Sequence, residues 1–388
     1  MLRMRRITIA MDSFKGSLAS GQVADAVERG LLRVLSSCEI RKVCIADGGE
    51  GTVEALVQNL CGELVDVEVC DALMRPIVAR YGIVDGGTTA VIEMSAACGL
   101  PLLKPEEYNP MKTSTYGTGE MIADALRRGC RKFLVGIGGS ATNDAGVGML
   151  QALGYRFLDA AGMELTGGGE ILERICSIDT TFVMSEIRDT EFVVACDVTN
   201  PLYGEQGAAY VFAPQKGANP TMVEHLDLGL RNFAKVVKRH NGIDIASLAG
   251  AGAAGGLGGG FVALLNARLE RGIDMVLDAM HFDNIINGCD LIITGEGRID
   301  NQTTMGKAPS GVLRLAQKQG IPVVAIGGEV VECAALKQSG FAAIIPVEAG
   351  VISLQEAMRP DVAMRNIERT AVMIAENIKS GDRIKGFV

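Results

Sequence analysis

The segment DLIITGEGRIDNQTTMGKAPSGV, residues 290–312, decides the fold class of this chain. Residues 291–294 are apolar or β-branched, which is typical of a strand buried on both faces of a parallel sheet. Loop chemistry follows, and the run from Ala308 to Ser310 predicts the first turn of a helix that ends at Gly320. The charged residues between the predicted strand and helix are Glu296, Arg298, Asp300 and Lys307. They follow the carboxyl end of a strand, which is where open α/β sheets bind ligands.

The same alternation of strand and helix occurs at both ends of the chain. Strands are predicted over 5–12, 40–49, 289–297, 321–328 and 342–350, with helices over 21–35, 51–60, 332–340 and 361–380. Neither end holds a full sheet by itself. We therefore expect residues 1–70 and 286–388 to form one domain with a parallel sheet. Residues 71–285 are expected to be inserted into it as a second α/β domain with mixed strands.

The middle of the chain begins with short alternating strands on either side of Asp85–Gly87, which indicates antiparallel hairpins. Helix and strand then alternate, and the residues from about Pro214 to Ala279 are predicted to be mainly helical. The uncharged stretch from Ile245 to Ala267 has the length of a membrane span. The glycines concentrated between Gly250 and Gly260 predict a loop there instead, and we expect no membrane contact.

The composition disfavours several classes of protein. A length of 388 residues with 48% hydrophobic residues predicts two domains with well-buried cores. A net charge of −9, no Trp and 4% aromatic residues disfavour binding to nucleic acid or to an anionic membrane. The ten cysteines form no C-x-x-C pair, which predicts a reduced cytoplasmic protein rather than a disulfide framework. Asp12 interrupts the apolar start, so we expect no export signal.

A second candidate site lies in KFLVGIGGSATNDAGVGML, residues 132–150, where a predicted strand is followed by a glycine-rich turn. A helix is predicted from about Asp144 to Leu153, and its positive end would help backbone N–H groups in the turn to bind an anion. The alternative is an N-capped turn without a ligand. Two glycines with Ser, Thr, Asn and Asp within seven positions favour phosphate binding. The residues concerned are Gly138, Gly139, Ser140 and Asn143.

The turns after the first two strands carry charges of both signs. Ser13 and Lys15 follow Asp12, and Lys15 is the only cation in that turn, so it is suited to neutralise a phosphate or carboxylate. Asp47 and Glu50 follow the second strand beside two glycines, where carboxylates are suited to a metal-bridged phosphate or to a substrate hydroxyl. The alternatives are a solvated lysine and a capping aspartate.

Asp197 ends the strand-like run FVVACD, so a carboxylate also follows a predicted strand in the middle of the chain. Together these strand ends predict ligand residues gathered at one sheet edge. The G-x-G-x-x-G match over Gly250–Gly255 has no convincing strand before it, so we interpret it as a glycine loop over a nucleotide or near a hinge. No G-x-x-x-x-G-K-[ST], H-R-D or D-F-G motif occurs, which excludes P-loop proteins and protein kinases.

Seven motifs occur in the order MDSFKGSLAS, ADGGEGTVEAL, YGTGE, GIGGSATNDAGVGMLQALG, CDVTNPLYGEQGAAYVFAPQKGA, AAGGLGGG and GEGRIDNQTTMGKAPSGV. With these motifs the chain resembles the bacterial glycerate kinase family of the type that forms 2-phosphoglycerate, from about Ile7 to beyond Gly328. The resemblance implies ATP-dependent phosphorylation of (R)-glycerate with Mg²⁺. It also implies a Rossmann-like domain built from both chain ends, an inserted α/β domain, and an active site in the cleft between them.

Phosphoryl transfer to an alcohol requires positioned phosphates, cations, and a carboxylate for the hydroxyl proton. The predicted catalytic residues are Asp197, Lys15, Arg298, Asp300 and Lys307. The predicted nucleotide-binding residues are Gly138, Gly139, Ser140, Asn143, Gly255 and Gly256. The predicted metal ligands are Asp47 and Glu296, and the predicted substrate-binding residues are Ser13, Asp47 and Arg298. Arg298 is included because a guanidinium matches the two oxygens of a carboxylate.

Other interpretations stay open at this level. A nicotinamide-dependent dehydrogenase would use GAGAAG, and a sensor protein would keep the turns without turnover. A kinase for a related small hydroxy acid, or one that forms 3-phosphoglycerate, would carry the same types of residue. The residues alone do not decide which carboxylate is the base, which divalent metal is preferred, or whether the protein is a monomer or a homodimer.

Overall fold

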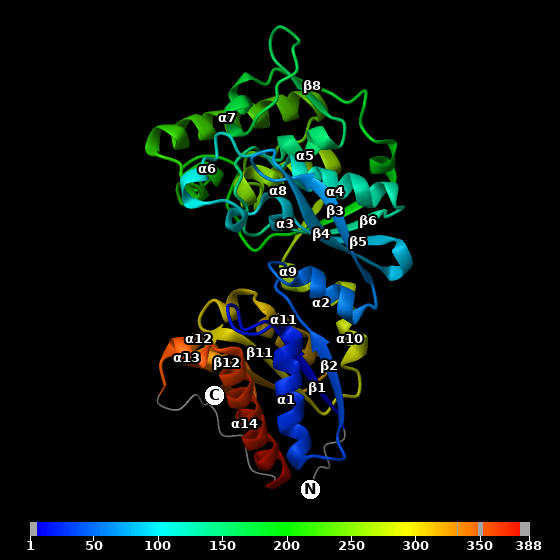
Figure 1. Ribbon diagram of the computed structural model, residues 1–388, viewed down its shortest axis with the longest axis vertical. Helices are drawn as coiled ribbons and strands as arrows, with labels where there is room; N and C mark the ends of the chain where they lie inside the picture. Colours follow the sequence, from blue (N-terminus) through cyan, green and yellow to red (C-terminus); the bar gives the residue numbers. More distant parts are fainter. Residues whose placement is uncertain (1–5, 332, 348–351, 381–388) are drawn as a thin grey trace. The chain divides into compact units, whose positions relative to one another are not determined.

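Figure 1 shows the computed structural model of the chain, which is a mixed α/β protein. The structure describes residues 6–331, 333–347 and 352–380. Within these residues, no helix is both long enough and apolar enough to cross a membrane. The alternation of strands and helices that the sequence predicts at both chain ends is present, and the predicted fold class is confirmed.

The chain divides into two compact units. The terminal unit combines Met1–Asp47 with Val276–Val388, and the central unit is Gly48–Met275. The sequence predicts the first boundary after residue 70, whereas in the structure the first segment of the terminal unit ends at Asp47. The difference arises because helix α2 (Thr52–Asn59) packs on strands of the central sheet and strand β3 (Glu63–Cys70) belongs to that sheet.

The terminal unit contains a five-stranded parallel sheet in the order β13-β12-β11-β1-β2, so both chain ends share one sheet. Its strands are β1 (Arg6–Met11), β2 (Glu39–Cys44), β11 (Leu291–Ile299), β12 (Val323–Val330) and β13 (Ala343–Pro346). Its helices are α1 (Ser20–Val34), α10 (Phe282–Ile285), α11 (Ala308–Lys318), α12 (Ala334–Lys337), α13 (Leu354–Ala357) and α14 (Pro360–Ser380). This sheet confirms the predicted Rossmann-like domain built from both chain ends.

Helices α1 and α14 lie side by side and cover one face of this sheet (Figure 1). Leu31 of α1, Ile293 of β11 and Ile374 of α14 belong to one buried apolar cluster. Gly30 lies where the two helices meet, and a Cβ atom there would overlap the backbone carbonyl of Glu368. Helix α11 contacts β1, β11 and β12 but contributes no residue to that cluster, so it covers the opposite face.

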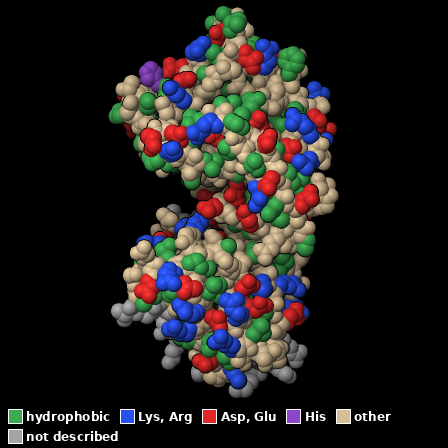
Figure 2. Space-filling view, in the orientation of Figure 1, with side chains coloured by type: hydrophobic (Ala, Val, Ile, Leu, Met, Phe, Trp, Pro, Cys, Tyr) green, Lys and Arg blue, Asp and Glu red, His purple; other side chains and the backbone are tan. Residues whose placement is uncertain are grey.

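Charged side chains of both signs are intermixed on the face of the terminal unit that Figure 2 shows. Lys42 Nζ lies 2.8 Å from Asp25 Oδ1 and 2.7 Å from Glu28 Oε2, which joins β2 to α1. Arg29 Nε lies 3.4 Å from Glu368 Oε2, which joins α1 to α14. These are exposed or half-buried ion pairs, and each is worth at most about 1 kcal/mol.

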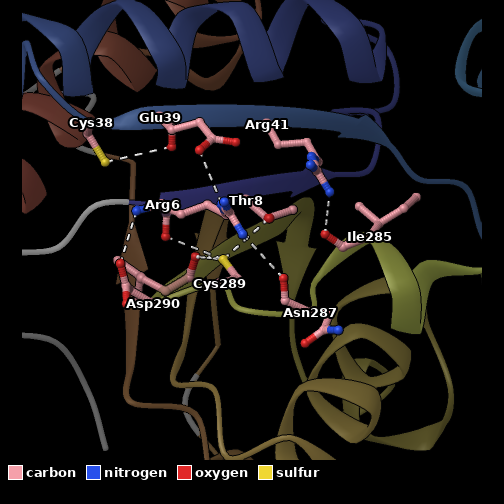
Figure 3. A network of polar contacts seen from close by, with 10 residues as sticks. Arg6, Thr8, Cys38, Glu39, Arg41, Ile285, Asn287, Cys289 and Asp290 are labelled. Carbon is pink, nitrogen blue, oxygen red and sulfur yellow. Dashed lines mark hydrogen bonds and ion pairs between the residues drawn. The ribbon is translucent and has the colours of Figure 1, made fainter.

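A polar network joins the amino ends of β1, β2 and β11 (Figure 3). Arg6 Nε donates a hydrogen bond to Glu39 Oε2 at 3.2 Å, and the backbone N–H of Arg6 donates to Asp290 Oδ2 at 3.0 Å. The thiol of Cys289 donates to the carbonyl oxygen of Leu291 at 2.9 Å. We call this network the amino edge of the terminal sheet. It ties the beginning of the described chain to its C-terminal part.

Strand β11 is longer than the sequence predicts. The buried run is predicted to end at Thr294 and the strand-like segment at residue 297, but β11 continues to Ile299 because its second half pairs with β12 as far as Val330. The expectation of a loop after Thr294 is therefore wrong, and Glu296 and Arg298 lie on the strand. Glycines and charges favour a loop in the sequence, and pairing with a neighbouring strand overrides that local preference.

The central unit contains a six-stranded mixed sheet in the order β10-β9-β6-β5-β4-β3. The further strands of this sheet are β4 (Pro76–Val84), β5 (Thr89–Glu93), β6 (Lys132–Gly136), β9 (Glu191–Ala195) and β10 (Arg268–Glu270). A separate two-stranded sheet consists of β7 (Arg156–Leu158) and β8 (Ser177–Asp179). The helices of the central unit are α2 (Thr52–Asn59), α3 (Ser95–Cys98), α4 (Tyr116–Arg127), α5 (Val147–Ala152), α6 (Ala208–Phe212), α7 (Pro220–Asn241) and α8 (Ala253–Leu265). The boundary between the units falls within α9 (Gly272–Ala279). Strands β4 and β5 are antiparallel on either side of Asp85–Gly87, which confirms the predicted hairpin.

The glycine-rich segment that the sequence predicts to be a loop forms helix α8 instead. Its first residues are irregular, with left-handed backbone at Gly255 and Gly256, and regular helix follows. A Cβ atom at Gly260 would overlap the carbonyl oxygen of Ala145, and one at Gly258 would approach that of Gly250. The glycines therefore allow a helix to pack closely against neighbouring backbone, which local preference does not reveal.

Candidate active site

Three carboxyl groups converge at the carboxyl ends of β1, β2 and β11. Met11 pairs with Gly295 in the parallel register, so Asp12 and Glu296 follow at neighbouring positions, and Asp47 follows β2. Burial raises the pKa of Asp12 to about 7, and the negative charges of Asp47 and Glu296 add to that rise. Burial also raises the pKa of Glu296. The sheet therefore gathers carboxylates that repel one another.

Two lysines lie among these carboxylates. Lys15 Nζ lies 3.2 Å from Asp47 Oδ2. Burial by itself would lower the pKa of Lys15, but the charges of Asp47 and Asp12 outweigh burial and raise it. Lys307 precedes α11, and its positive charge acts against the rise in the pKa of Glu296. We call this group of lysines and carboxylates the carboxyl edge of the terminal sheet.

Arg298 lies two residues after Glu296 on β11, so both side chains project from the same face of the strand. Its guanidinium lies 3.2 Å from Asp300 Oδ2 and 3.2 Å from Glu329 Oε2, and the side chain is 59% exposed. Thr303 Oγ1 donates to Glu296 Oε1 at 2.6 Å and accepts the N–H of Asp300 at 3.0 Å. The predicted residues Arg298 and Asp300 are thus a pair, and Thr303 links Asp300 to Glu296.

A cavity of about 330 Å³ opens at the carboxyl edge, entirely within the terminal unit. Its polar part is lined by Asp12, Ser13, Lys15, Ser17, Glu296, Arg298, Lys307 and Glu329. Of these, Asp12, Ser17 and Glu329 are not among the site residues predicted from the sequence. Asp47 and Asp300 do not line the cavity, but each accepts a hydrogen bond from a residue that does. Lys15 donates to Asp47, and Arg298 donates to Asp300.

The carboxyl edge fits a divalent cation that is bound together with a ligand. Within the described residues, no group of three or more His, Cys, Asp or Glu side chains is arranged to hold a metal alone. Mg²⁺ in nucleotide sites commonly takes one or two carboxylates and completes its shell with phosphate oxygens and water. The repulsion of Asp12 by Asp47 and Glu296 would be relieved by such an ion. The predicted ligands Asp47 and Glu296 are compatible with this mode of binding.

The second candidate site lies in the turn after β6 of the central unit. Lys216 Nζ donates to Ser140 Oγ at 2.7 Å and to the carbonyl oxygen of Thr142 at 2.6 Å. The lysine is only 2% exposed. Burial lowers the pKa of Lys216 to about 7, and the charge of Asp144 acts in the opposite direction. A buried lysine therefore holds this turn from within the protein.

The helix predicted to begin at Asp144 begins later, at Val147. The carboxylate of Asp144 instead accepts hydrogen bonds from the N–H groups of Thr115 at 2.8 Å and Gly148 at 3.2 Å. Burial raises the pKa of Asp144. Helix α5 is short and begins well after Ser140, so the expectation that a helix dipole assists the turn at that residue is wrong.

The predicted nucleotide-binding glycines fall into two groups. Gly138 and Gly139 are exposed on the turn, whereas Gly255 and Gly256 are buried against its inner side. Gly255 and Gly256 have φ angles of 70° and 92°. A Cβ atom on Gly255 would overlap the carbonyl oxygen of Thr142, and one on Gly256 would crowd the side chain of Leu230 and the backbone of Ala145. Asn143 is buried, and neither its side-chain oxygen nor its nitrogen has a hydrogen-bond partner among the described residues. The structure brings all these positions to one turn.

Asp197 follows β9, which is paired in parallel with β6. Its Oδ1 accepts the N–H of Gly272, the first residue of α9, at 3.0 Å. Asp197 thus lies at the same sheet edge as the turn after β6, within the central unit. The other predicted catalytic residues, which are Lys15, Arg298, Asp300 and Lys307, belong to the terminal unit.

The site residues predicted from the sequence do not include Asp12, Lys216 or Thr303. The signal for Asp12 is available, because it ends a predicted strand in the same way as Asp197 does. No local pattern marks Lys216 as buried, since that depends on elements far away in the sequence. Thr303 lies in a polar run, and its bond to Glu296 is evident only once β11 and the following turn are folded.

Comparisons with known proteins agree on one family. The model of the glycerate kinase family matches residues 7–379. A glycerate kinase of Bacillus subtilis (strain 168) is 45% identical over 375 residues, which cover 96% of this chain and 98% of that protein. A glycerate 2-kinase of Escherichia coli (strain K12) is 42% identical, with 98% and 100% coverage. A crystal structure assigned as glycerate kinase 2 of Salmonella typhimurium LT2 has a TM-score of 0.90 at 43% identity, covering 97% of this chain and 99% of that one.

Proposed function

Because this chain belongs to the glycerate kinase family, we propose that it transfers the γ-phosphoryl group of ATP to the 2-hydroxyl of (R)-glycerate. The products are ADP and 2-phosphoglycerate, and Mg²⁺ is required. The observation that carries this proposal is the cavity at the carboxyl edge, where lysines, an arginine and carboxylates face one space. Phosphoryl transfer depends on positioning and on fixed charges, and this set of side chains supplies both.

The lysines of the carboxyl edge are assigned to phosphate. Lys15 and Lys307 line the cavity, and each is a compact cation that suits a phosphate oxygen. Asp47 and Glu296 are assigned to Mg²⁺, which when bound neutralises charge on the phosphates. When the ligand is bound, contacts of Lys15 with phosphate and of Asp47 with Mg²⁺ replace part of the ion pair between these two residues.

Glycerate recognition is assigned to Ser13 and Arg298, which line the same cavity. The guanidinium of Arg298 can bind both oxygens of the glycerate carboxylate, and Asp300 holds it in position. Asp12 is assigned as the acceptor of the 2-hydroxyl proton. Burial keeps its pKa near 7, which suits a group that must accept a proton at neutral pH.

The turn after β6 is assigned to an anionic oxygen of the nucleotide. Gly138 and Gly139 expose their backbone, and the hydroxyl of Ser140 is held by Lys216. Asn143 belongs to the same turn, and Gly255 and Gly256 support it by close packing. Asp197, at the neighbouring strand end, is kept as a catalytic candidate on its position and charge.

The position of phosphorylation is inferred from a relative. The Escherichia coli protein is named a glycerate 2-kinase and matches 98% of this chain. We therefore favour the 2-hydroxyl over the 3-hydroxyl. The two products have the same mass, so the position must be identified from the product itself.

The proposal is tested by incubating the purified protein with Mg-ATP and (R)-glycerate. We expect ADP release that depends on glycerate, and a phosphorus resonance split by a single methine proton, because C2 carries one hydrogen and C3 carries two. Lactate, which lacks the 3-hydroxyl, and the S enantiomer are matched controls for substrate selection. No glycerate-dependent ADP would refute the kinase activity, and a resonance split by two protons would refute the position.

A further inference from the structure

The cavity of the terminal unit has a second part that the proposed chemistry does not use. It is lined by Val347, Leu354, Ala357, Met358, Ala363 and Ile367. These residues come from the end of β13, from α13 and from the first turns of α14. Leu354 is 74% exposed, so the apolar part is open to solvent at this residue. We call this part the apolar half of the cavity.

One polar side chain lies in the apolar half. Asn366 of α14 lines the cavity and is only 5% exposed. Its backbone carbonyl accepts a hydrogen bond from Thr370 Oγ1 at 3.0 Å, but its side-chain amide bonds to no other described residue. A ligand that offers both a donor and an acceptor could bond to both atoms of that amide.

The apolar half is attached directly to the polar part. Ser17 Oγ, in the turn after β1, donates to the carbonyl oxygen of Met358 at 2.7 Å. Gly16 of the same turn has a φ of 77°, and a Cβ atom on it would lie 3.1 Å from Cε of Met358. The turn that carries Lys15 therefore packs against the wall of the apolar half, so one ligand can occupy both.

Glycerate does not match this two-part cavity, because it is small and polar over its whole surface. A nucleotide does match, since its phosphates are charged and its base is a flat ring with apolar faces and a few polar atoms on its edge. A cavity of about 330 Å³ is within the range of small-ligand sites. An asparagine amide can donate to a ring nitrogen of adenine and accept from its exocyclic amine at the same time.

We propose that the apolar half of the cavity binds the adenine ring of the nucleotide, and that Asn366 determines the specificity for the base. The inference rests on the proposed use of ATP and adds the place where its base is recognised. Ala357 and Ala363 are the small residues of the wall that leave room for the ring.

The test compares ATP with purine riboside 5′-triphosphate, which lacks the exocyclic amine, in steady-state kinetics with glycerate. For the unaltered protein we expect the KM of the analogue to be about tenfold higher, the effect of one lost hydrogen bond. Asn366→Leu, which replaces the amide with an apolar side chain of similar size, should raise the KM of ATP by about tenfold and remove the difference between the two nucleotides. The KM of glycerate should not change.

A second variant tests the location without relying on Asn366. Ala363→Phe should fill the space of the ring and abolish competitive inhibition by adenosine, which carries no phosphate. Asn377→Ala, at an asparagine of the same helix outside the cavity, is the matched control and should behave as the unaltered protein does. Thermal unfolding verifies that each variant is folded.

The outcomes separate this inference from the proposed function. If ATP supports phosphorylation of glycerate, but both variants keep the unaltered KM for ATP and the unaltered inhibition by adenosine, the base binds elsewhere and the inference is overturned. A discrimination between ATP and the analogue that survives in Asn366→Leu would also overturn the role of Asn366. A protein that does not use ATP at all would refute the proposed function first.

Discussion

Charged groups are arranged in opposite ways at the two edges of the terminal sheet. At the amino edge, Arg6 lies between the carboxylate of Glu39 and the carbonyl of Asn287, and its N–H meets Asp290 (Figure 3). At the carboxyl edge, burial and mutual repulsion raise the pKa of Asp12, and like charges share a small space. The first arrangement joins distant parts of the chain and stabilises them.

The second arrangement has no such structural benefit. Carboxylates gathered in a partly buried space cost free energy when they are charged, so the folded protein would be more stable without them. Residues that weaken a fold in this way are commonly part of a binding or catalytic site. The comparison therefore predicts that stability and activity respond in opposite directions at the two edges.

The largest effect is expected for Asp12→Asn. Loss of the proton acceptor should lower kcat/KM by about 10³-fold. Because the pKa of Asp12 is raised from 3.8 to about 7, the carboxyl group supports the fold at low pH and loses that effect as the pH rises through 7. At pH 8 the neutral amide should therefore raise the free energy of unfolding by up to roughly 4 kcal/mol.

Urea unfolding at pH 8 and pH 4, with kinetics on the same preparations, checks this prediction. At pH 4 the aspartate is mostly protonated in the folded state, so most of the gain in stability should disappear. Ser13→Ala, at the next residue, is a control for disturbance of the turn in the unfolding measurements only, because Ser13 is itself assigned to glycerate. If Asp12→Asn is less stable at pH 8 than the unaltered protein, the carboxyl edge does not carry the unfavourable charge that we assign to it.

Much of the carboxyl edge follows from the sequence, and the reason is the parallel sheet. The carboxyl ends of parallel strands meet at one edge, so Lys15, Asp47 and Glu296 can be grouped from strand patterns that lie far apart in the chain. The burial of Asp12 and the role of Thr303 cannot be obtained in this way. They depend on how the turns fold over the strand ends, where local patterns are weak.

Two of the wrong predictions, the loop after Thr294 and the glycine-rich loop, have one physical cause. Beyond Thr294, β11 is stabilised by its partner β12, and helix α8 is stabilised by close contact of its glycines with other backbone. Both are tertiary effects that reverse a local preference for loop. The place of Asn366 in the cavity also depends on tertiary structure, since the periodicity of α14 does not reveal that this residue faces a cavity.

A smaller effect on stability is expected in the turn after β6, where a lysine is buried. The pKa of Lys216 is lowered from 10.5 to about 7, so the folded protein binds fewer protons than the unfolded chain between these values. Stability should therefore rise with pH through this window, by roughly 1 kcal/mol for each pH unit. Lys216→Met should lack this contribution.

The measurement is the difference in free energy of unfolding between Lys216→Met and the unaltered protein at pH 7.5 and pH 9.5. We expect that difference to change by about 2 kcal/mol in favour of the unaltered protein as the pH rises. Lys132→Met, at a half-buried lysine on β6, is the matched control and should show little change. A difference that is the same at both pH values would mean that Lys216 keeps its proton in the folded state.

The smallest effect is expected at the amino edge. Arg6→Ala removes the contacts of the guanidinium with Glu39 and Asn287 while leaving the backbone bond to Asp290 in place. The side chain is partly exposed, and ion pairs of that kind contribute up to about 1 kcal/mol, so the loss in stability should not exceed that value by much. The kcat and both KM values should be unchanged, because this edge lies at the opposite ends of the strands from the cavity. Chemical denaturation and steady-state kinetics together decide the matter: a clear fall in kcat for Arg6→Ala, in protein shown to be folded, would mean that the two edges are coupled through the sheet and do not have separate roles.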